Sequence, residues 1–258
     1  MYHPSRIRLT EYPGAMIRLP LLDTAKPEHF PDPRKALDEP NGLLAFGGDL
    51  TPRRLLAAYA QGIFPWFNED EPLLWWSPDP RCVFHTAELK PNRSLRRRLA
   101  QVSWRITVDH AFGEVVKACA APRPGQSGTW IVPAMVDAYT RLHLLGHAHS
   151  VEVWEEDRLV GGIYGIAVGR LFCGESMFSR ESGGSRVALT ALAQLLRQWD
   201  FPWIDAQVTN AHLLQLGAVE YPRPQFLRTV SQLAHLPGQP GLWKEFTPLA
   251  QIAPSGSL

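Results

Sequence analysis

Three strand-like stretches follow one another with very short turns between them, and this pattern constrains the fold more than any other feature of the sequence. The stretches are residues 150–155, 159–168 and 171–179, with turns at 156–157 and 169–170. Turns this short join antiparallel neighbours of one sheet. A helix predicted for residues 185–199 then leads into a short strand at 203–208. The second half of the chain is therefore predicted to fold as a mixed α and β domain.

The first half of the chain has a different character, because aromatic residues and prolines alternate through it. One clear helix begins with Thr51 as its cap and Pro52 at its first position, and it ends at Gly62. Two X-Pro steps follow within residues 77–80, and such steps favour a rigid, extended connection. We therefore predict a small N-terminal domain over residues 1–79 and a larger domain over residues 80–258.

Charge and cysteine usage exclude several classes of protein. The 26 basic and 25 acidic side chains give a net charge of +1, which argues against a histone-like protein that coats nucleic acid. The three cysteines are widely spaced and form no C-x-x-C motif, as expected in a reducing compartment. We find no signal peptide and no apolar run long enough to span a membrane. The expected location is the cytoplasm.

Three polar side chains on predicted strands are candidate functional residues. Asp205 and Gln207 stand two residues apart on an otherwise apolar strand, so regular alternation would place them on one face. Glu175 lies inside another apolar strand, where a carboxylate is costly unless it meets a cation or hydrogen-bond donors. The functional interpretation is a reaction centre beside a receptor for a cationic substrate. A structural hydrogen-bonded pair at 205 and 207, and an internal ion pair between Glu175 and an arginine, remain open alternatives.

A cationic segment at residues 90–98 predicts a phosphate-binding helix. It contains Lys90, Arg93, Arg96, Arg97 and Arg98 with few acids nearby. Clustered arginines on a helix are typical of a nucleic-acid surface. The alternative is an ordinary solvated helix face.

Two further patterns indicate function more weakly. His143, His147 and His149 invite a metal site, but no cysteine or carboxylate nearby in the sequence completes a ligand set, so we predict no metal. The glycine-rich turn at residues 180–185 precedes a helix, and such turns can hold a phosphate, as in enzymes that bind coenzyme A.

Nine sequence segments together resemble the bacterial leucyl/phenylalanyl-tRNA–protein transferase family and cover roughly residues 30 to 230. They are EPNGLLA (39–45), GGDL (47–50), GIFPWF (62–67), WWSPDPR (75–81), GTWI (128–131), LGHAHSVE (145–152), FCGESMFSR (172–180), IDAQ (204–207) and LGA (216–218). The resemblance implies an α+β fold: a small N-terminal α/β domain followed by a mixed-sheet domain like that of acetyltransferases. The order of the predicted sheet, helix and final strand agrees by analogy with such a domain.

The resemblance also implies an activity and its partners. Members move Leu or Phe, and by our expectation also Met, from aminoacyl-tRNA to proteins that begin with Arg or Lys, which marks those proteins for degradation. They use no metal or coenzyme. Two other classes stay open from the residues alone: an acetyl-CoA-dependent enzyme and a non-catalytic module that binds tRNA or protein N-termini.

The family pattern assigns roles to residues of this chain. Asp205 and Gln207 would be catalytic, with Gln207 holding the attacking amine, and Glu175 would bind the acceptor N-terminus. Trp66 and Trp130 would stack on the end of the tRNA, and Arg93, Arg96, Arg97 and Arg98 would bind its phosphates. An apolar pocket for the aminoacyl side chain would be lined by Ile163, Phe172, Met177, Leu192, Leu196 and Ile204, although ordinary core packing is the alternative for each.

Overall fold

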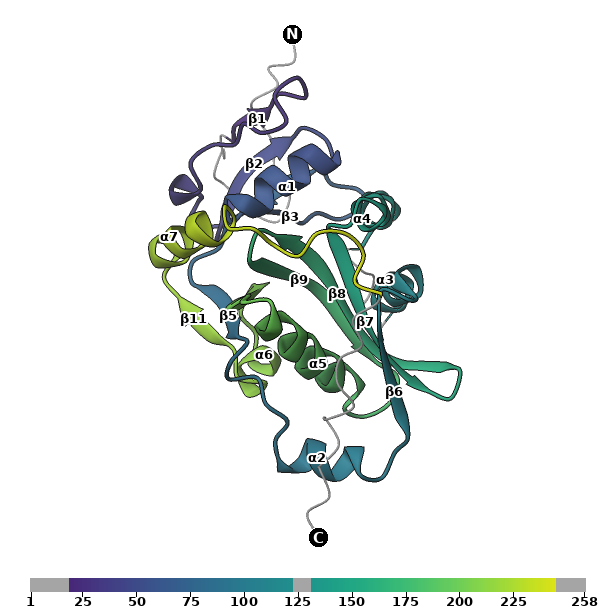
Figure 1. Ribbon diagram of the computed structural model, residues 1–258. Coiled ribbons are helices and arrows are strands. Elements are labelled where there is room, and N and C mark those ends of the chain that lie inside the picture. Colours follow the sequence, from purple (N-terminus) through teal and green to yellow (C-terminus); the bar gives the residue numbers. More distant parts are fainter. Residues whose placement is uncertain (1–18, 123–130, 245–258) are drawn as a thin grey trace.

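A computed structural model describes residues 19–122 and 131–244, which form two sheets with helices packed around them (Figure 1). The smaller sheet lies in the N-terminal part and has the strand order β1-β2-β4-β3. Its strands are β1 Leu21–Leu22, β2 Leu43–Gly47, β3 Phe64–Pro65 and β4 Leu74–Trp76. A single turn of 3-10 helix, Pro33–Lys35, precedes β2.

Helix α1, Pro52–Ala60, connects β2 to β3, and the signals that predicted it are confirmed. The Thr51 side chain accepts a hydrogen bond from the backbone N–H of Arg54, and Pro52 occupies the first turn. Leu55, Ala58 and Tyr59 form the buried face at the spacing of an amphipathic helix. Gly62 follows with a φ of +71°, a left-handed conformation that glycine adopts without strain.

The larger sheet has seven strands in the order β11-β5-β10-β9-β8-β7-β6. Its strands are β5 Arg81–His85, β6 Trp104–Val108, β7 Ala148–Glu155, β8 Arg158–Val168, β9 Leu171–Ser179, β10 Trp203–Gln207 and β11 Val219–Tyr221. All neighbours are antiparallel except β9 and β10, which run parallel. Parallel neighbours need a crossover connection, which explains why a helix lies between those two strands in the sequence.

Helices cover both faces of the larger sheet. Helix α5, Gly184–Gln198, packs on one face, and α3, Phe112–Ala120, and α4, Pro133–Leu144, pack on the other. The remaining helices are α2 Arg93–Leu99, α6 Ala211–Gln215 and α7 Arg223–Leu233. Successive side chains of β8 alternate between the faces. Tyr164 belongs to the core formed with α1, α3 and α4, whereas its neighbour Ile163 belongs to the core formed with α5. The sheet is therefore the middle layer between two helical layers.

The predicted α+β class and the strand meander are confirmed. Strand β9 has the predicted bounds, and the other two strands of the meander, the helix at 185–199 and the strand at 203–208 agree within two residues. The segment at 77–80, where we predicted the domain boundary, lies between β4 and β5, which belong to different sheets. The division into two domains stays a prediction. Within residues 19–122 and 131–244, no helix is long and apolar enough to cross a lipid bilayer.

Candidate active site

Two β-bulges lie side by side in the larger sheet, and each contains or adjoins a candidate functional residue. Between β8 and β9, Gly165 pairs with Gly174 and Tyr164 pairs with Ser176, so Glu175 is the extra residue. Between β10 and β5, the register shifts between Asp205 and Gln207. Bulges change the direction in which side chains project, and they are common next to active sites.

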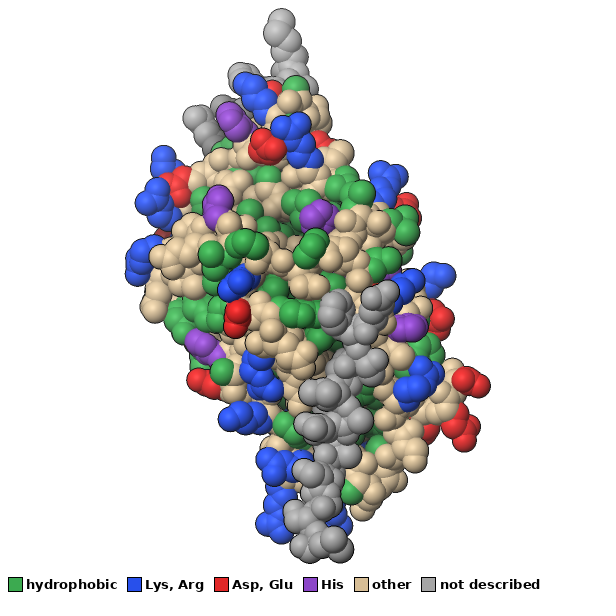
Figure 2. Space-filling view, in the orientation of Figure 1, with side chains coloured by type: hydrophobic (Ala, Val, Ile, Leu, Met, Phe, Trp, Pro, Cys, Tyr) green, Lys and Arg blue, Asp and Glu red, His purple; other side chains and the backbone are tan. Residues whose placement is uncertain are grey.

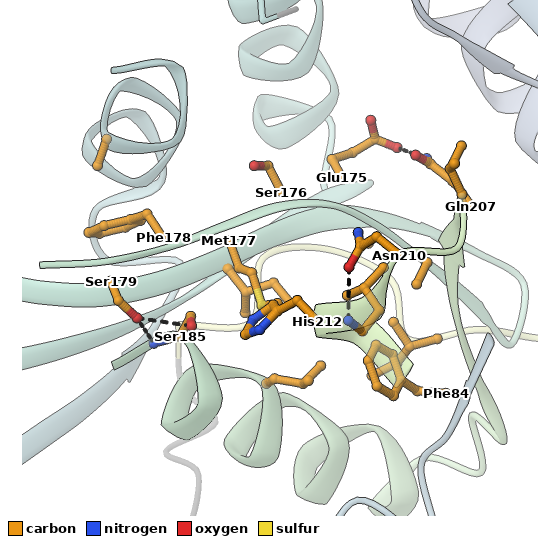
Figure 3. A pocket seen from close by; sticks show the side chains of 18 of the residues that line it. Phe84, Glu175, Ser176, Met177, Phe178, Ser179, Ser185, Gln207, Asn210 and His212 are labelled. Atoms are coloured by element: carbon orange, nitrogen blue, oxygen red, sulfur yellow. Dashed lines mark hydrogen bonds between the residues drawn. The ribbon is translucent and has the colours of Figure 1, made fainter. Parts of the chain in front are cut away.

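Glu175 and Gln207 meet beside these two bulges, two residues beyond the paired residues Cys173 and Asp205 of β9 and β10. The Nε2 amide of Gln207 donates a hydrogen bond to Oε1 of Glu175 over 2.8 Å (Figure 3). Gln207 adopts a φ of +63°, which is uncommon for a residue with a side chain. The sheet thus brings a carboxylate and an amide from two strands into direct contact.

Both side chains line a cavity of about 870 Å³. One wall is apolar and includes the predicted pocket residues Ile163, Met177 and Ile204, together with Phe84 and Leu189. Glu175 and Gln207 line the same cavity, as do other polar side chains that include Arg180, Asn210 and His212. A cavity with one apolar wall and a few convergent polar groups is typical of a small-molecule or substrate site.

The other three residues predicted for the apolar pocket lie behind its wall. Phe172, Leu192 and Leu196 are at most 1% exposed and belong to the core between the sheet and α5. They do not line the cavity. Their direct contact with an aminoacyl group stays a prediction, and the packing alternative describes their present surroundings.

Glu175 is only 8% exposed, and its carboxylate is held by neutral donors. One oxygen accepts from Gln207 and the other accepts from the hydroxyl of Tyr139. Burial raises the pKa of Glu175 to about 7, although hydrogen bonds from Tyr139, Tyr59 and Gln207 oppose this rise. Among residues 19–122 and 131–244, no arginine or lysine forms an ion pair with Glu175. The internal Arg pair considered from the sequence is therefore absent from the described structure.

Buried tyrosines surround this carboxylate, and sequence reasoning did not identify them. The hydroxyls of Tyr59, from α1, and Tyr139, from α4, lie 3.2 Å apart. Burial and the nearby Glu175 charge raise the pKa of both phenols, so both stay protonated as donors. Tyr59 lies within the helix predicted between Thr51 and Gly62, and nothing in its position in the sequence indicates that its hydroxyl lies near a carboxylate from a distant strand.

Asp205 has a different environment from Gln207. Its side chain is 1% exposed and accepts two hydrogen bonds from the guanidinium of Arg81, at 2.8 and 2.7 Å. Its Oδ1 also accepts from the backbone N–H of Gln207 at 3.0 Å. Because of the bulge, the expected alternation does not apply: the two side chains meet different partners, and Asp205 does not line the cavity.

Of the two predicted aromatic platforms, one lies within the described structure. Trp66 lines the cavity, is 41% exposed, and packs at a tilt against Trp76 with ring centroids 5.5 Å apart. An exposed indole at a cavity mouth is suited to stack on a nucleobase. Trp130 lies outside the described residues.

The predicted basic helix is α2, and its arginines are not equivalent. Asn92 caps the helix, and Arg93, Arg96 and Arg97 are exposed. Arg98 points back to the protein, where its guanidinium lies 5.3 Å from the Trp104 ring centroid and 3.9 Å from Glu181. Lysines and arginines gather on the surface at the end of the molecule where α2 lies (Figure 2). Three of the four predicted arginines are thus available to an external anion.

The two weaker sequence patterns form internal contacts. At the start of α5, the backbone N–H of Ser185 is bonded to Oγ of Ser179 at 2.8 Å, within the glycine-rich turn. The buried imidazole of His149 pairs with Asp109, Nδ1 to Oδ2, at 2.8 Å. The part of the chain that the structure describes contains no group of three His, Cys, Asp or Glu side chains able to hold a metal ion.

Comparison with known proteins decides the family. The family model described as leucyl/phenylalanyl-tRNA protein transferase matches residues 83–231, more than half of the chain, and the family model of the N-terminal domain matches residues 48–79. The chain belongs to the leucyl/phenylalanyl-tRNA–protein transferase family. A family member from Xanthomonas axonopodis pv. citri is 56% identical over 224 residues, which cover 86% of this chain and 90% of the relative. Another, from Shewanella baltica, is 55% identical over 216 residues, covering 84% and 91%.

Family membership makes the chain an aminoacyltransferase. It does not agree with the two alternatives left open by the sequence, an acetyl-CoA-dependent enzyme and a non-catalytic binding module. Two solved structures show a more distant likeness, each with a TM-score of 0.37. One is a functionally unknown conserved protein from Staphylococcus epidermidis, 13% identical, covering 55% of this chain and 57% of that one. The other is L-PGS from Bacillus licheniformis, 10% identical, covering 65% and 54%.

Proposed function

We propose that this protein transfers Leu or Phe, and also Met, from aminoacyl-tRNA to proteins whose N-terminal residue is Arg or Lys. The product would be an N-terminal degradation signal, and the reaction would take place in the cytoplasm. The observation that carries the proposal is the meeting, in one cavity, of an apolar wall and a buried carboxylate that has no cationic partner among the described residues. The first suits the donor's side chain and the second suits a basic acceptor.

The acceptor site would be formed around Glu175. A carboxylate surrounded by neutral tyrosine and amide donors has its charge stabilised only in part, which agrees with the rise of its pKa to about 7. An arriving guanidinium or ammonium group would supply the missing positive charge. This arrangement favours Arg or Lys over neutral residues at the acceptor N-terminus.

Gln207 would hold the attacking α-amine. An ionised Glu175 can only accept hydrogen bonds, so the contact between them fixes the Gln207 amide with its nitrogen toward the carboxylate. The amide oxygen is then left to accept a hydrogen bond from the amine. Gln207 is a poor proton acceptor, so its role would be positioning rather than acid–base chemistry.

The chemical demand of the reaction is modest because the ester of aminoacyl-tRNA is already activated. The acceptor nitrogen forms a bond to the ester carbonyl carbon, the bond from that carbon to the ribose oxygen breaks, and the proton lost by nitrogen ends on the ribose oxygen. An α-amine has a pKa of about 7.7–8.0, so a useful fraction is unprotonated near neutral pH. Holding amine and ester in the right geometry can therefore supply most of the rate.

The donor would be held at three places. Its side chain would occupy the wall formed by Ile163, Met177 and Ile204, and its terminal adenosine would stack on Trp66, with Trp130 as the second predicted platform. Backbone phosphates would contact Arg93, Arg96 and Arg97. Arg98 would contribute less to phosphate binding, because its guanidinium packs against Trp104 and lies near Glu181.

A transfer assay tests this proposal directly. Labelled leucyl-tRNA is offered with two peptides that differ only in their first residue, Arg or Ala. We expect label on the Arg peptide and far less on the Ala peptide. Equal transfer to both would contradict the acceptor site, and no transfer to either would contradict the proposed substrates.

A further inference from the structure

A chain of buried contacts runs from the N-terminal part of the protein to Gln207, and Arg81 is its central residue. The guanidinium of Arg81 donates from Nη1 to the carbonyl of Gly62 at 2.9 Å, and from Nε and Nη2 to the two oxygens of Asp205. Asp205 in turn accepts from the backbone N–H of Gln207. All of these donors form hydrogen bonds inside the protein.

The surroundings of Arg81 fix its guanidinium in one place. The group lies between two aromatic rings, with its central carbon 4.8 Å from the ring centroid of Phe64 and 4.6 Å from that of Phe226. Its side chain is 1% exposed. A planar guanidinium held by two rings and a bidentate carboxylate has a single orientation, which a lysine ammonium cannot reproduce.

Gln207 needs such support because its backbone conformation is unfavourable. It follows a register shift and adopts a left-handed φ of +63°, and such conformations persist only where neighbouring contacts impose them. The bond from its N–H to Asp205 is the contact that opposes relaxation of the bulge. Without it, the side chain would no longer reach Glu175 at the observed distance.

We infer that Arg81 is a positioning residue for the transfer reaction, acting through Asp205 to hold Gln207 in the conformation that presents its amide to the acceptor. The inference rests on the role proposed above for Gln207. It also gives Asp205 a positioning role: its oxygens face Arg81 and the backbone rather than the cavity. Phe64, which packs on Arg81, lines the same cavity. The contacts that hold Gln207 therefore include a residue of the cavity that would bind the aminoacyl donor.

The test combines kinetics with a double-mutant cycle. Arg81→Met should lower kcat by about 100-fold, the effect of a small misplacement of a reacting group, while KM for both substrates stays near wild type. The kcat of Arg81→Lys should lie between those of wild type and Arg81→Met, because the lysine ammonium can still reach one oxygen of Asp205. In a Gln207→Ala background, Arg81→Met should have no further effect on kcat. An equal loss of kcat in both backgrounds, or a wild-type kcat for Arg81→Met, would overturn the inference.

Arg54→Met is the matched control for loss of a buried arginine. Arg54 is also fully buried and pairs with an aspartate, Asp49, but its guanidinium bonds lie within the N-terminal part, to the carboxylate of Asp49 and the backbone carbonyl of Asp23. This variant should lose stability and keep kcat in the folded enzyme. A fall in kcat as large as that of Arg81→Met would show a general structural effect and would overturn the inference.

A second measurement does not depend on catalysis. The side-chain amide of Gln207 is observed by NMR in protein labelled with ¹⁵N-glutamine, and its signal is assigned by its absence from Gln207→Ala. The signal should move toward the position of a solvent-exposed amide in Arg81→Met and stay unchanged in Arg54→Met. An unchanged signal in Arg81→Met would overturn the inference. If Gln207→Ala retains full activity, the proposed function of Gln207 fails, and the NMR result still decides whether Arg81 positions it.

Discussion

The Gln207 side-chain amide donates to the carboxylate of Glu175 across the gap between β9 and β10, over 2.8 Å. The parallel register of these two strands, in which Asp205 lies opposite Cys173, leads to Gln207 and Glu175 two residues further on, and each of the two lies at a bulge against the strand on its other side. Since the carboxylate also accepts from Tyr139, its contacts join β9, β10 and α4 at a single point. The proposed function depends on this contact.

Gln207→Ala and Asp205→Ala should have different consequences. Gln207→Ala should lower kcat by about 100-fold, through loss of amine positioning, and leave folding and tRNA affinity near wild type. From the residue pattern alone, Asp205→Ala is expected to behave in the same way. The structure changes that expectation, because removing Asp205 leaves the Arg81 guanidinium buried and unpaired, which should cost about 3–5 kcal/mol of folding free energy. Chemical denaturation and steady-state kinetics on both variants distinguish the two; equal stability of the two variants would contradict the buried pair.

The raised pKa of Glu175 predicts how stability depends on pH. In the unfolded chain this carboxyl loses its proton near its ordinary pKa of 4.5, whereas in the folded protein it keeps the proton until about pH 7. The folded state thus binds more protons between these values, and the contribution of this group to stability is lost as the pH rises from 4.5 to 7. The loss should be about 3 kcal/mol, from about 1.36 kcal/mol for each unit of pKa.

Glu175→Gln is the control for this pH effect, because the amide is similar in shape and does not titrate. The difference in unfolding free energy between wild type and variant should change steadily from pH 4.5 to pH 7, because only the wild type has the contribution of Glu175 that is lost over this range. A constant difference over that range would show that the pKa of Glu175 is not raised.

Binding of tRNA should weaken with salt and depend on three arginines of α2. For about three phosphate contacts the slope of log K against log salt should be roughly −2 to −3, and each lost contact should flatten it by somewhat under one. Single alanine variants of Arg93, Arg96 and Arg97 should each weaken tRNA binding and flatten the slope. Arg98→Ala should have a smaller effect on both, because that side chain packs on Trp104. Arg34→Ala removes an exposed arginine from the N-terminal part and serves as the control. Unchanged affinity and slope in the Arg93, Arg96, Arg97 triple variant would identify α2 as a solvated face.

How far the site was predictable from the sequence depends on the residue. Strand-like runs joined by two-residue turns predicted the meander, because turns of that length join antiparallel neighbours of one sheet. The family resemblance predicted Glu175, Gln207 and the apolar wall. The bulges were not predictable, since a register shift has no signature in residues such as Ala206. The Arg81–Asp205 pair was also missed, because the two residues are 124 positions apart and only the folded sheet makes them neighbours.

Met177 should influence the choice between donors. It lines the apolar wall opposite Ile163 in the β8–β9 ladder, and its flexible thioether suits both a branched chain and a ring. A bulkier Met177→Trp should cost Phe transfer more than Leu transfer. One methylene is worth only about 1–3 kcal/mol in such a pocket, so wild-type discrimination among Leu, Phe and Met should be modest. The measurement is the ratio of kcat/KM for phenylalanyl-tRNA and leucyl-tRNA, and an unchanged ratio in a folded variant would remove Met177 from the pocket.

The central claim is that the buried charge of Glu175 selects the basic acceptor, and one comparison tests it most directly. Transfer of Leu from leucyl-tRNA is measured at about pH 8, above the raised pKa of about 7, where the carboxylate is ionised. The peptides begin with Arg or Ala, and the enzymes are wild type and Glu175→Gln, which removes the charge, keeps an acceptor oxygen for Gln207 and replaces the oxygen that faces Tyr139 with an amide group. We predict a strong preference for the Arg peptide in wild type that is largely lost in Glu175→Gln, mainly through slower reaction of the Arg peptide. A variant that keeps the wild-type preference would contradict the claim.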